Sequence, residues 1–217
     1  MILINFKIYK ETFGEGAIKL AKIIKEVGDK YKIRMIIAAS ALDAVRIKNE
    51  TGAEVWLQNV DEYGEGKHTG WISAKQALAL GIKGSLINHF EHQIAKGTVL
   101  KIIKNKPTGF EIAGCVKSVG QIKEWAARAK PDYIFYEPPE LIASKETSVA
   151  TTKPDSIKKA VEDSGEIPLI VGAGVKSRED VEISLKMGAK AVGLASAFVL
   201  GKDPKGVLEG IASGFSV

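Results

Sequence analysis

The feature that most constrains this chain is a repeated alternation between short apolar runs and longer segments with helical spacing. Each of the eight runs has the length and the β-branched or apolar composition of a buried strand. They are Ile2–Phe6, Ile33–Ala38, Glu54–Leu57, Lys83–Ile87, Phe110–Cys115, Tyr133–Tyr136, Pro168–Val171 and Ala191–Leu194. Strands that alternate with helices and show no hairpin signal predict an α/β fold with a parallel sheet.

The segments between these runs have the spacing of helices and carry signals for helix starts and ends. Ala17–Val27 carries apolar residues at positions 17, 18, 20, 21, 23, 24 and 27, which is the spacing of one helix face. Ser40 with Asp43, and Ser177 with Asp180, have the spacing of capping boxes at helix starts, although such pairs also occur by chance. Glycines stand where helices are predicted to end, at Gly28, Gly52, Gly81 and Gly188.

Length and composition favour one domain. The 217 residues divide into eight units of about 27, and no Pro/Gly/Ser-rich linker interrupts them. We therefore predict a single (β/α)8 barrel domain over residues 1–217, while periodicity by itself leaves a doubly wound sheet open. The longest irregular stretches, Asn59–Ile72 and Pro138–Lys153, are long enough to be functional or to lie in an interface.

Charge and cysteine content argue against several classes of function. The net charge of +5 comes from scattered Lys and Arg interleaved with acids, which argues against nucleic-acid binding and suits a small anionic metabolite. The single cysteine, Cys115, cannot form an internal disulfide, and the N-terminus has no signal-peptide pattern. Because no apolar run is long enough to span a bilayer, we expect a cytoplasmic protein without a membrane partner.

Polar and titratable residues stand at the ends of three of the predicted strands. Asn5 and Lys7 end the first, His89 and Glu91 follow the fourth, and Glu137 follows the sixth. In a parallel barrel these strand ends meet at the face where active sites lie, so Lys, His and Glu would form a proton-transfer group. Each residue alone has a plainer interpretation as a structural histidine, a turn cap or a solvated charge.

The seventh and eighth strands end differently, in turns of small residues. Gly172-Ala173-Gly174 and Leu194-Ala195-Ser196 let backbone N–H groups approach a ligand closely. Such turns ahead of helices are typical phosphate sites of barrels. A tight turn without a ligand is the alternative interpretation of either motif alone.

Taken together, these segments resemble the signature segments of triosephosphate isomerases, in order and spacing, over essentially the whole chain. The compact length and the Glu-Pro-Pro-Glu-Leu-Ile form are similar to the archaeal branch. The matching segments are Asn5-Phe6-Lys7, Ile87-Asn88-His89-Phe90-Glu91, Tyr136-Glu137-Pro138-Pro139-Glu140-Leu141-Ile142, Gly172-Ala173-Gly174 and Leu194-Ala195-Ser196.

The resemblance implies a role for each site residue. Glu137 would be the base that removes a proton next to the substrate carbonyl, and neutral His89 would polarise that carbonyl. Lys7 and Asn5 would stabilise the developing oxyanion and contact the phosphate, and Glu91 would hold Lys7 in place. The phosphate-binding residues would be Asn5, Lys7, Ile142, Gly174, Ala195 and Ser196.

The resemblance also implies partners and cofactors. The substrates would be the triose phosphates of glycolysis and gluconeogenesis, interconverted without a cofactor. No metal is expected, because the three histidines show no ligand spacing with carboxylates or the cysteine. The family assembles through its third loop, so we expect self-association as a homodimer or homotetramer, involving Asn59–Ile72.

Two departures from the family pattern keep other functions open. Phe90 stands where the family usually has Ser, and the sixth loop lacks the usual glycines at Ala143, Ser144 and Lys145 and is one residue longer. A weakened isomerase that serves as a triose-phosphate-binding protein is therefore one alternative. Another phosphate-binding barrel isomerase or synthase is the second, although it would lack the full Asn-x-Lys, His and Glu-Pro set.

Overall fold

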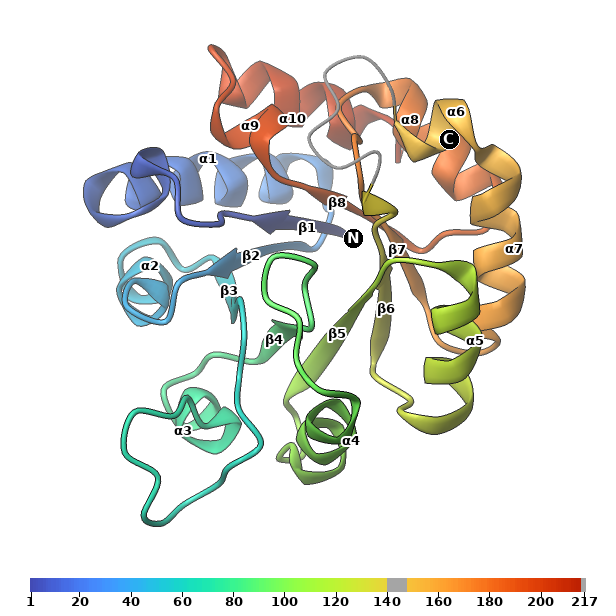
Figure 1. Cartoon of the computed structure of the whole chain (residues 1–217). Helices are drawn as coiled ribbons and strands as arrows, with labels where there is room; N and C mark the ends of the chain where they lie inside the picture. Colours follow the sequence, from blue (N-terminus) through green and yellow to red (C-terminus); the bar gives the residue numbers. More distant parts are fainter. Residues whose placement is uncertain (140–147, 216–217) are drawn as a thin grey trace.

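Eight parallel strands close into a barrel in the computed structural model of this protein, which describes residues 1–139 and 148–215 (Figure 1). Each strand pairs with the next one along the chain, and β8 pairs with β1 through registers such as Leu3 with Gly193. The strands are β1 (Ile2–Asn5), β2 (Met35–Ala39), β3 (Glu54–Leu57), β4 (Gly84–Ile87), β5 (Glu111–Val116), β6 (Tyr133–Tyr136), β7 (Leu169–Val171) and β8 (Ala191–Leu194). The prediction of a (β/α)8 barrel is confirmed, and closure excludes the doubly wound sheet.

Helices surround the barrel on the outside (Figure 1). In chain order the helical elements are the 3-10 helix η1 (Lys10–Thr12), α1 (Gly14–Tyr31), α2 (Ala44–Thr51), α3 (Ala74–Ala79), α4 (Lys96–Asn105), α5 (Val119–Arg128), α6 (Val149–Thr152), α7 (Pro154–Ser164), α8 (Arg178–Lys186), α9 (Ser196–Val199) and α10 (Pro204–Ser213). Within the described residues, none of these helices has the length and apolar character needed to cross a lipid bilayer.

The helix starts and ends predicted from the sequence are partly correct. Ser177 and Asp180 form the predicted capping box at the start of α8. The pair Ser40 and Asp43 does not cap α2: the Asp43 carboxylate instead accepts the backbone N–H of Gly14, at 3.0 Å. Gly28 lies inside α1, which continues to Tyr31, so the prediction of a helix end at Gly28 is wrong.

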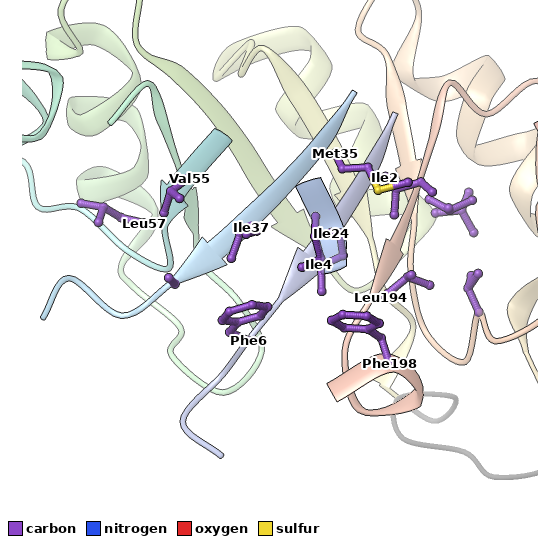
Figure 2. Packing of buried hydrophobic residues seen from close by; sticks show 14 of the residues in the cluster. Ile2, Ile4, Phe6, Ile24, Met35, Ile37, Val55, Leu57, Leu194 and Phe198 are labelled. Carbon is purple, nitrogen blue, oxygen red and sulfur yellow. The ribbon is translucent and has the colours of Figure 1, made fainter. Parts of the chain in front are cut away.

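Two apolar layers hold the fold together. One cluster draws its buried members from all eight strands and from no helix, so it fills the barrel interior; it includes Leu3, Trp56 and Phe135. The second lies between the barrel and its helices, because strand side chains alternate between the two sides. Figure 2 shows Ile2 and Ile4 of β1 packing in this outer layer with Ile24 of α1.

Large interior side chains are accommodated by glycines on other strands of the barrel. A Cβ added at Gly84 would lie 2.5 Å from the indole of Trp56, and one at Gly193 would lie 2.2 Å from the ring of Phe135. Dense interiors do not yield to such overlaps, so these strand glycines are set by packing. The sequence around these glycines does not reveal this role, because the aromatic side chain that each one accommodates is distant along the chain.

A stability prediction follows for Gly114 of β5, where a Cβ would lie 2.2 Å from Cζ3 of buried Trp125 in α5. We expect Gly114→Ala to lower the free energy of unfolding by about 1–3 kcal/mol, the usual cost of overpacking. The matched control is Gly120→Ala in α5, where the added methyl meets nothing within 4 Å. Denaturant unfolding of both variants measures this, and equal stability of the two would contradict the packing argument.

Candidate active site

The end of β1 places Lys7 through a strained turn. Lys7 has a φ of 50°, in the left-handed region that non-glycine residues rarely adopt. The Asn5 side-chain oxygen accepts the Lys7 backbone N–H at 3.0 Å, and the Gln58 amide donates to the Lys7 carbonyl at 2.9 Å. These two bonds compensate the strain and keep the lysine side chain, 14% exposed, at the strand-end face of the barrel.

A second strained residue, Asn88, places His89 at the end of β4. Asn88 has a φ of 57°, and its side chain donates to the Cys115 carbonyl at 3.1 Å while accepting the Ile94 backbone N–H at 3.2 Å. The turn is therefore tied to β5 and to the end of the loop that leads into α4. His89, which comes next, is buried at 7% exposure.

Glu137 follows β6, and its backbone N–H donates to the Val116 carbonyl of β5 at 2.9 Å. Its side chain is 14% exposed and lies over β7, where a Cβ at Gly172 would come within 2.7 Å of the Glu137 Cγ. Gly172 therefore provides the space that the carboxylate occupies.

The three strand ends bring their side chains together. Lys7 Nζ donates to Glu91 Oε1 at 2.7 Å, and Glu91 Oε2 lies 3.5 Å from His89 Nδ1. On the other side of the imidazole, His89 Nε2 lies 3.4 Å from Glu137 Oε2. The lysine, histidine and glutamate singled out in the sequence thus form one continuous group, with Glu91 between the first two.

Burial keeps the imidazole of His89 neutral. Desolvation lowers the His89 pKa from 6.5 to about 4, with Glu91 opposing this and Lys7 adding to it. Nδ1 accepts the backbone N–H of Glu91 at 3.3 Å, so in the neutral ring the proton is on Nε2. The N–H group of His89 is therefore on the nitrogen nearer to Glu137, 3.4 Å from its Oε2, without forming a hydrogen bond to it.

Burial has the opposite effect on the Glu137 carboxyl. Desolvation raises the Glu137 pKa from 4.5 to about 7, with Lys7 lowering it and Glu91 raising it. Among the described residues, no hydrogen-bond donor reaches the buried Glu137 Oε2. A carboxylate with a pKa near neutrality and few hydrogen bonds is an effective general base.

A pH prediction follows from these two pKa values. Glu137 acts as a base only when ionised, so kcat/KM is expected to fall about tenfold per pH unit below pH about 7 and to level off above it. His89, with its pKa at about 4, adds no limb in this range. A profile of kcat/KM from pH 5 to 9 measures this, and a midpoint at or below 6, where a phosphate monoester itself titrates, would contradict the assignment.

The small-residue turns line a cavity beside Glu137. The cavity has a volume of about 480 Å³, and its lining includes Lys7, Glu137, Gly174, Ala195 and Ser196. In the turn after β7, the backbone is left-handed at both Ala173 (φ 64°) and Gly174 (φ 83°). Such a turn exposes backbone N–H groups to a ligand, as an anion site requires.

Helix dipoles add less to this cavity than the sequence suggests. The α8 helix begins only at Arg178, four residues after Gly174, and α9 after the second turn has only the four residues Ser196–Val199. An anion bound here would therefore rely on backbone amides and on the lysines of the cavity lining, Lys7 and Lys176.

A second cavity, of about 760 Å³, adjoins the first. It is lined by Asn5, Lys7, Gln58, His89 and Glu91 among others. Lys7 also lines the first cavity, so its ammonium group stands between the two.

The structure gives roles to residues for which sequence reasoning proposed none. Gln58, after β3, holds the Lys7 carbonyl; Asn88 shapes the turn before His89; Tyr9 lines both cavities. Gln58 stands at a strand end like the predicted residues, which is the signal that could have found it.

The predicted phosphate contact Ile142 lies outside the described residues. Within residues 1–139 and 148–215, no cluster of His, Cys, Asp or Glu is arranged to hold a metal ion.

Comparison with known proteins identifies the family. The family model described as triosephosphate isomerase matches residues 1–117 and 111–211. Curated relatives named triosephosphate isomerase include those of Archaeoglobus fulgidus, 36% identical over 96% of this chain and 95% of the relative, and Thermoplasma volcanium, 35% identical over 94% of each chain. The relative from Methanothermus fervidus is 34% identical over 96% of each chain. The closed barrel, its strand-end residues and these full-length matches agree, and the chain belongs to the triosephosphate isomerase family.

Proposed function

We propose that this chain interconverts dihydroxyacetone phosphate and D-glyceraldehyde 3-phosphate through an enediolate, as an enzyme of glycolysis and gluconeogenesis. The observation that carries the proposal is the pairing of a neutral His89 donor with the Glu137 carboxylate, 3.4 Å apart. His89 lines one of the two adjoining cavities and Glu137 the other, and Lys7 lines both.

In the proposed reaction, ionised Glu137 removes a proton from the carbon next to the substrate carbonyl. The electron pair moves onto the carbonyl oxygen and forms the enediolate. His89 then moves a proton between the two enediolate oxygens: its Nε2–H protonates the oxyanion, and the same nitrogen takes the hydroxyl proton from the other oxygen. The protonated Glu137 returns a proton to the neighbouring carbon as the second oxygen becomes the carbonyl, which completes the exchange of aldehyde and ketone. A base with a pKa of about 7 can both accept and return this proton near neutral pH.

Stabilisation of the enediolate is assigned to His89 and Lys7. The Nε2–H of His89 would donate to the developing oxyanion, and the Lys7 ammonium, held by Glu91 at 2.7 Å, would supply a fixed positive charge. Preorganised donors of this kind contribute roughly 3–4 kcal/mol each to a barrier. Asn5 acts beside them by holding the Lys7 backbone.

The substrate phosphate is assigned to the cavity of about 480 Å³. The backbone N–H groups of Gly174, Ala195 and Ser196 would bind its oxygens, with Lys7 on the side facing the reacting carbons. We retain Ile142 as a further phosphate contact on the grounds of the family resemblance. The proposed steps use only side chains and amides of this chain.

The proposal is tested by a coupled assay run in both directions, with each triose phosphate in turn as substrate. Turnover in both directions supports it. Binding of a triose phosphate without turnover would instead favour a triose-phosphate-binding protein. Turnover of a different phosphorylated sugar alone would favour another barrel isomerase.

We further propose that the enzyme is cytoplasmic and a homodimer or homotetramer. Self-association is supported by exposed apolar side chains around the second cavity and the third loop, with Ile8 81% exposed, Leu42 95% and Trp71 52%. Light scattering coupled to size-exclusion chromatography gives the oligomeric state directly, and a monomer would contradict this part of the proposal.

A further inference from the structure

Phe90 is an exposed aromatic residue next to His89, and its ring contacts two residues of the candidate active site. Its ring centroid lies 5.2 Å from that of His89, with an angle of 52° between the ring planes. The Lys7 ammonium lies 5.8 Å from the same ring, within the range of a cation–π interaction. Lys7 is thus held by the Glu91 carboxylate and by an aromatic face.

The ring also lies beside the carboxylate of Glu137. Phe90 and Glu137 both line a small cavity of about 10 Å³, together with Asn88, Cys115 and Gln121 among others. This volume is at the lower limit for a single water molecule. A shorter side chain at position 90 would enlarge this space and bring bulk water to the base.

The charged and titratable groups facing Glu137 come from several elements. Lys7 after β1 favours its ionised form, Glu91 after β4 disfavours it, and His89 and Cys115 also lie close by. Lys117 and Lys176 line cavities that Glu137 also lines. The phenyl ring of Phe90 adds no charge, so its effect on the Glu137 pKa would arise through exclusion of water, while its effect on Lys7 would arise through the cation–π contact.

We propose that Phe90 is a positioning residue of the isomerase site, one that fixes the Lys7 ammonium and keeps water away from the Glu137 carboxylate. The proposal rests on the proposed function. It gives a purpose to the aromatic residue that interrupts the family pattern at this position.

Two variants of the full-length protein separate the two effects. Phe90→Ala removes both the aromatic face and the cover, so the acid limb of the kcat/KM profile should move about half a pH unit lower and kcat should fall about tenfold. Phe90→Leu keeps an apolar cover but loses the aromatic face, so the limb should stay in place while kcat/KM falls about two- to fivefold. Leu100→Ala is the matched control, since Leu100 on α4 has nearly the same exposure, 37% against 38%, and its profile should not change.

A measurement without turnover keeps this inference separate from the proposed function. Carbon NMR of protein labelled at glutamate carboxyls follows the ionisation of Glu137, with its signal assigned by Glu137→Gln. The pKa of Glu137 should be lower in Phe90→Ala than in the wild type or in Phe90→Leu.

An unchanged titration together with a kcat within twofold of the wild type in Phe90→Ala would overturn the role of Phe90. If Phe90→Ala fails to fold, Phe90→Leu remains as the test. A wild-type kcat/KM in Phe90→Leu would show that the contact between Phe90 and Lys7 does not contribute to the reaction. An inactive wild type would instead overturn the proposed function, and the NMR titration would still decide whether Phe90 shields the carboxylate.

Discussion

Glu137→Gln is expected to lower kcat by about 10⁴, at the upper end of the range for loss of a general base. The amide has nearly the same shape as the carboxylate but cannot accept a proton from carbon. The phosphate cavity is unchanged, so the inhibition constant of inorganic phosphate should stay within about tenfold of the wild-type value. A variant that retained more than about a tenth of the wild-type kcat would exclude Glu137 as the base.

The same substitution is expected to stabilise the protein above neutral pH. The Glu137 pKa is raised from 4.5 to about 7 in the folded state, so the native protein binds this proton more tightly than the unfolded chain does. The wild-type free energy of unfolding therefore falls as pH rises from 4.5 to 7, by up to about 3 kcal/mol at 1.36 kcal/mol per unit.

The amide introduced by Glu137→Gln carries no charge at any pH, so the variant does not lose stability through ionisation of a buried group. Denaturant unfolding at pH 8 should show it to be more stable than the wild type, and the two should converge near pH 4. Equal stability at both pH values would show that the carboxylate is better solvated than its burial indicates. A gain in stability accompanied by a loss of activity is expected where a fold holds a base in a dry site.

His89→Ala is the substitution with the next largest expected effect, a decrease in kcat of roughly 10²–10⁴ with a smaller change in KM. The reason is that the Nε2–H of His89 becomes a strong partner only when negative charge develops on the substrate oxygen. His89 is neutral at working pH, so its loss leaves the Lys7–Glu91 ion pair in place.

Steady-state kinetics in both directions measure this effect, and His92→Ala is a matched control. His92 is an exposed histidine in the same loop that also lines the second cavity. Its backbone N–H donates to the His89 carbonyl at 2.8 Å, a bond that the substitution keeps, so its variant should keep a rate close to that of the wild type. A change in KM alone for His89→Ala would make His89 a binding residue and would remove it from the proposed proton-transfer group.

Much of the fold could be predicted from the sequence because the signals involved are local. All eight strands lie where apolar runs predicted them, since strands buried on both faces need continuous apolar residues. The capping box of Ser177 and Asp180 was likewise predictable, because its partners are three residues apart. The capping box predicted for Ser40 and Asp43 was wrong because the partner is not local. The Asp43 carboxylate accepts a hydrogen bond from the start of α1, 29 residues away.

The candidate residues were also predictable as chemical types at strand ends, where the topology of a parallel barrel brings them to one face. Their geometry was not. The contact between Lys7 and Glu91 joins residues 84 apart in sequence, and the Gln58 bond that holds Lys7 spans 51. No local pattern records such distances, because they depend on how the strands pair around the barrel.

The sequence by itself thus determined the strands, the helices between them and the kinds of side chain that follow each strand. Only the tertiary structure decided that β8 pairs with β1, that Lys7 and Asn88 adopt left-handed turns, and that the Phe90 ring faces Lys7. It also decided the protonation of His89 and Glu137, since a pKa depends on burial and on neighbouring charges in space. Composition specifies the groups available for chemistry, but desolvation and through-space contacts specify their reactivity.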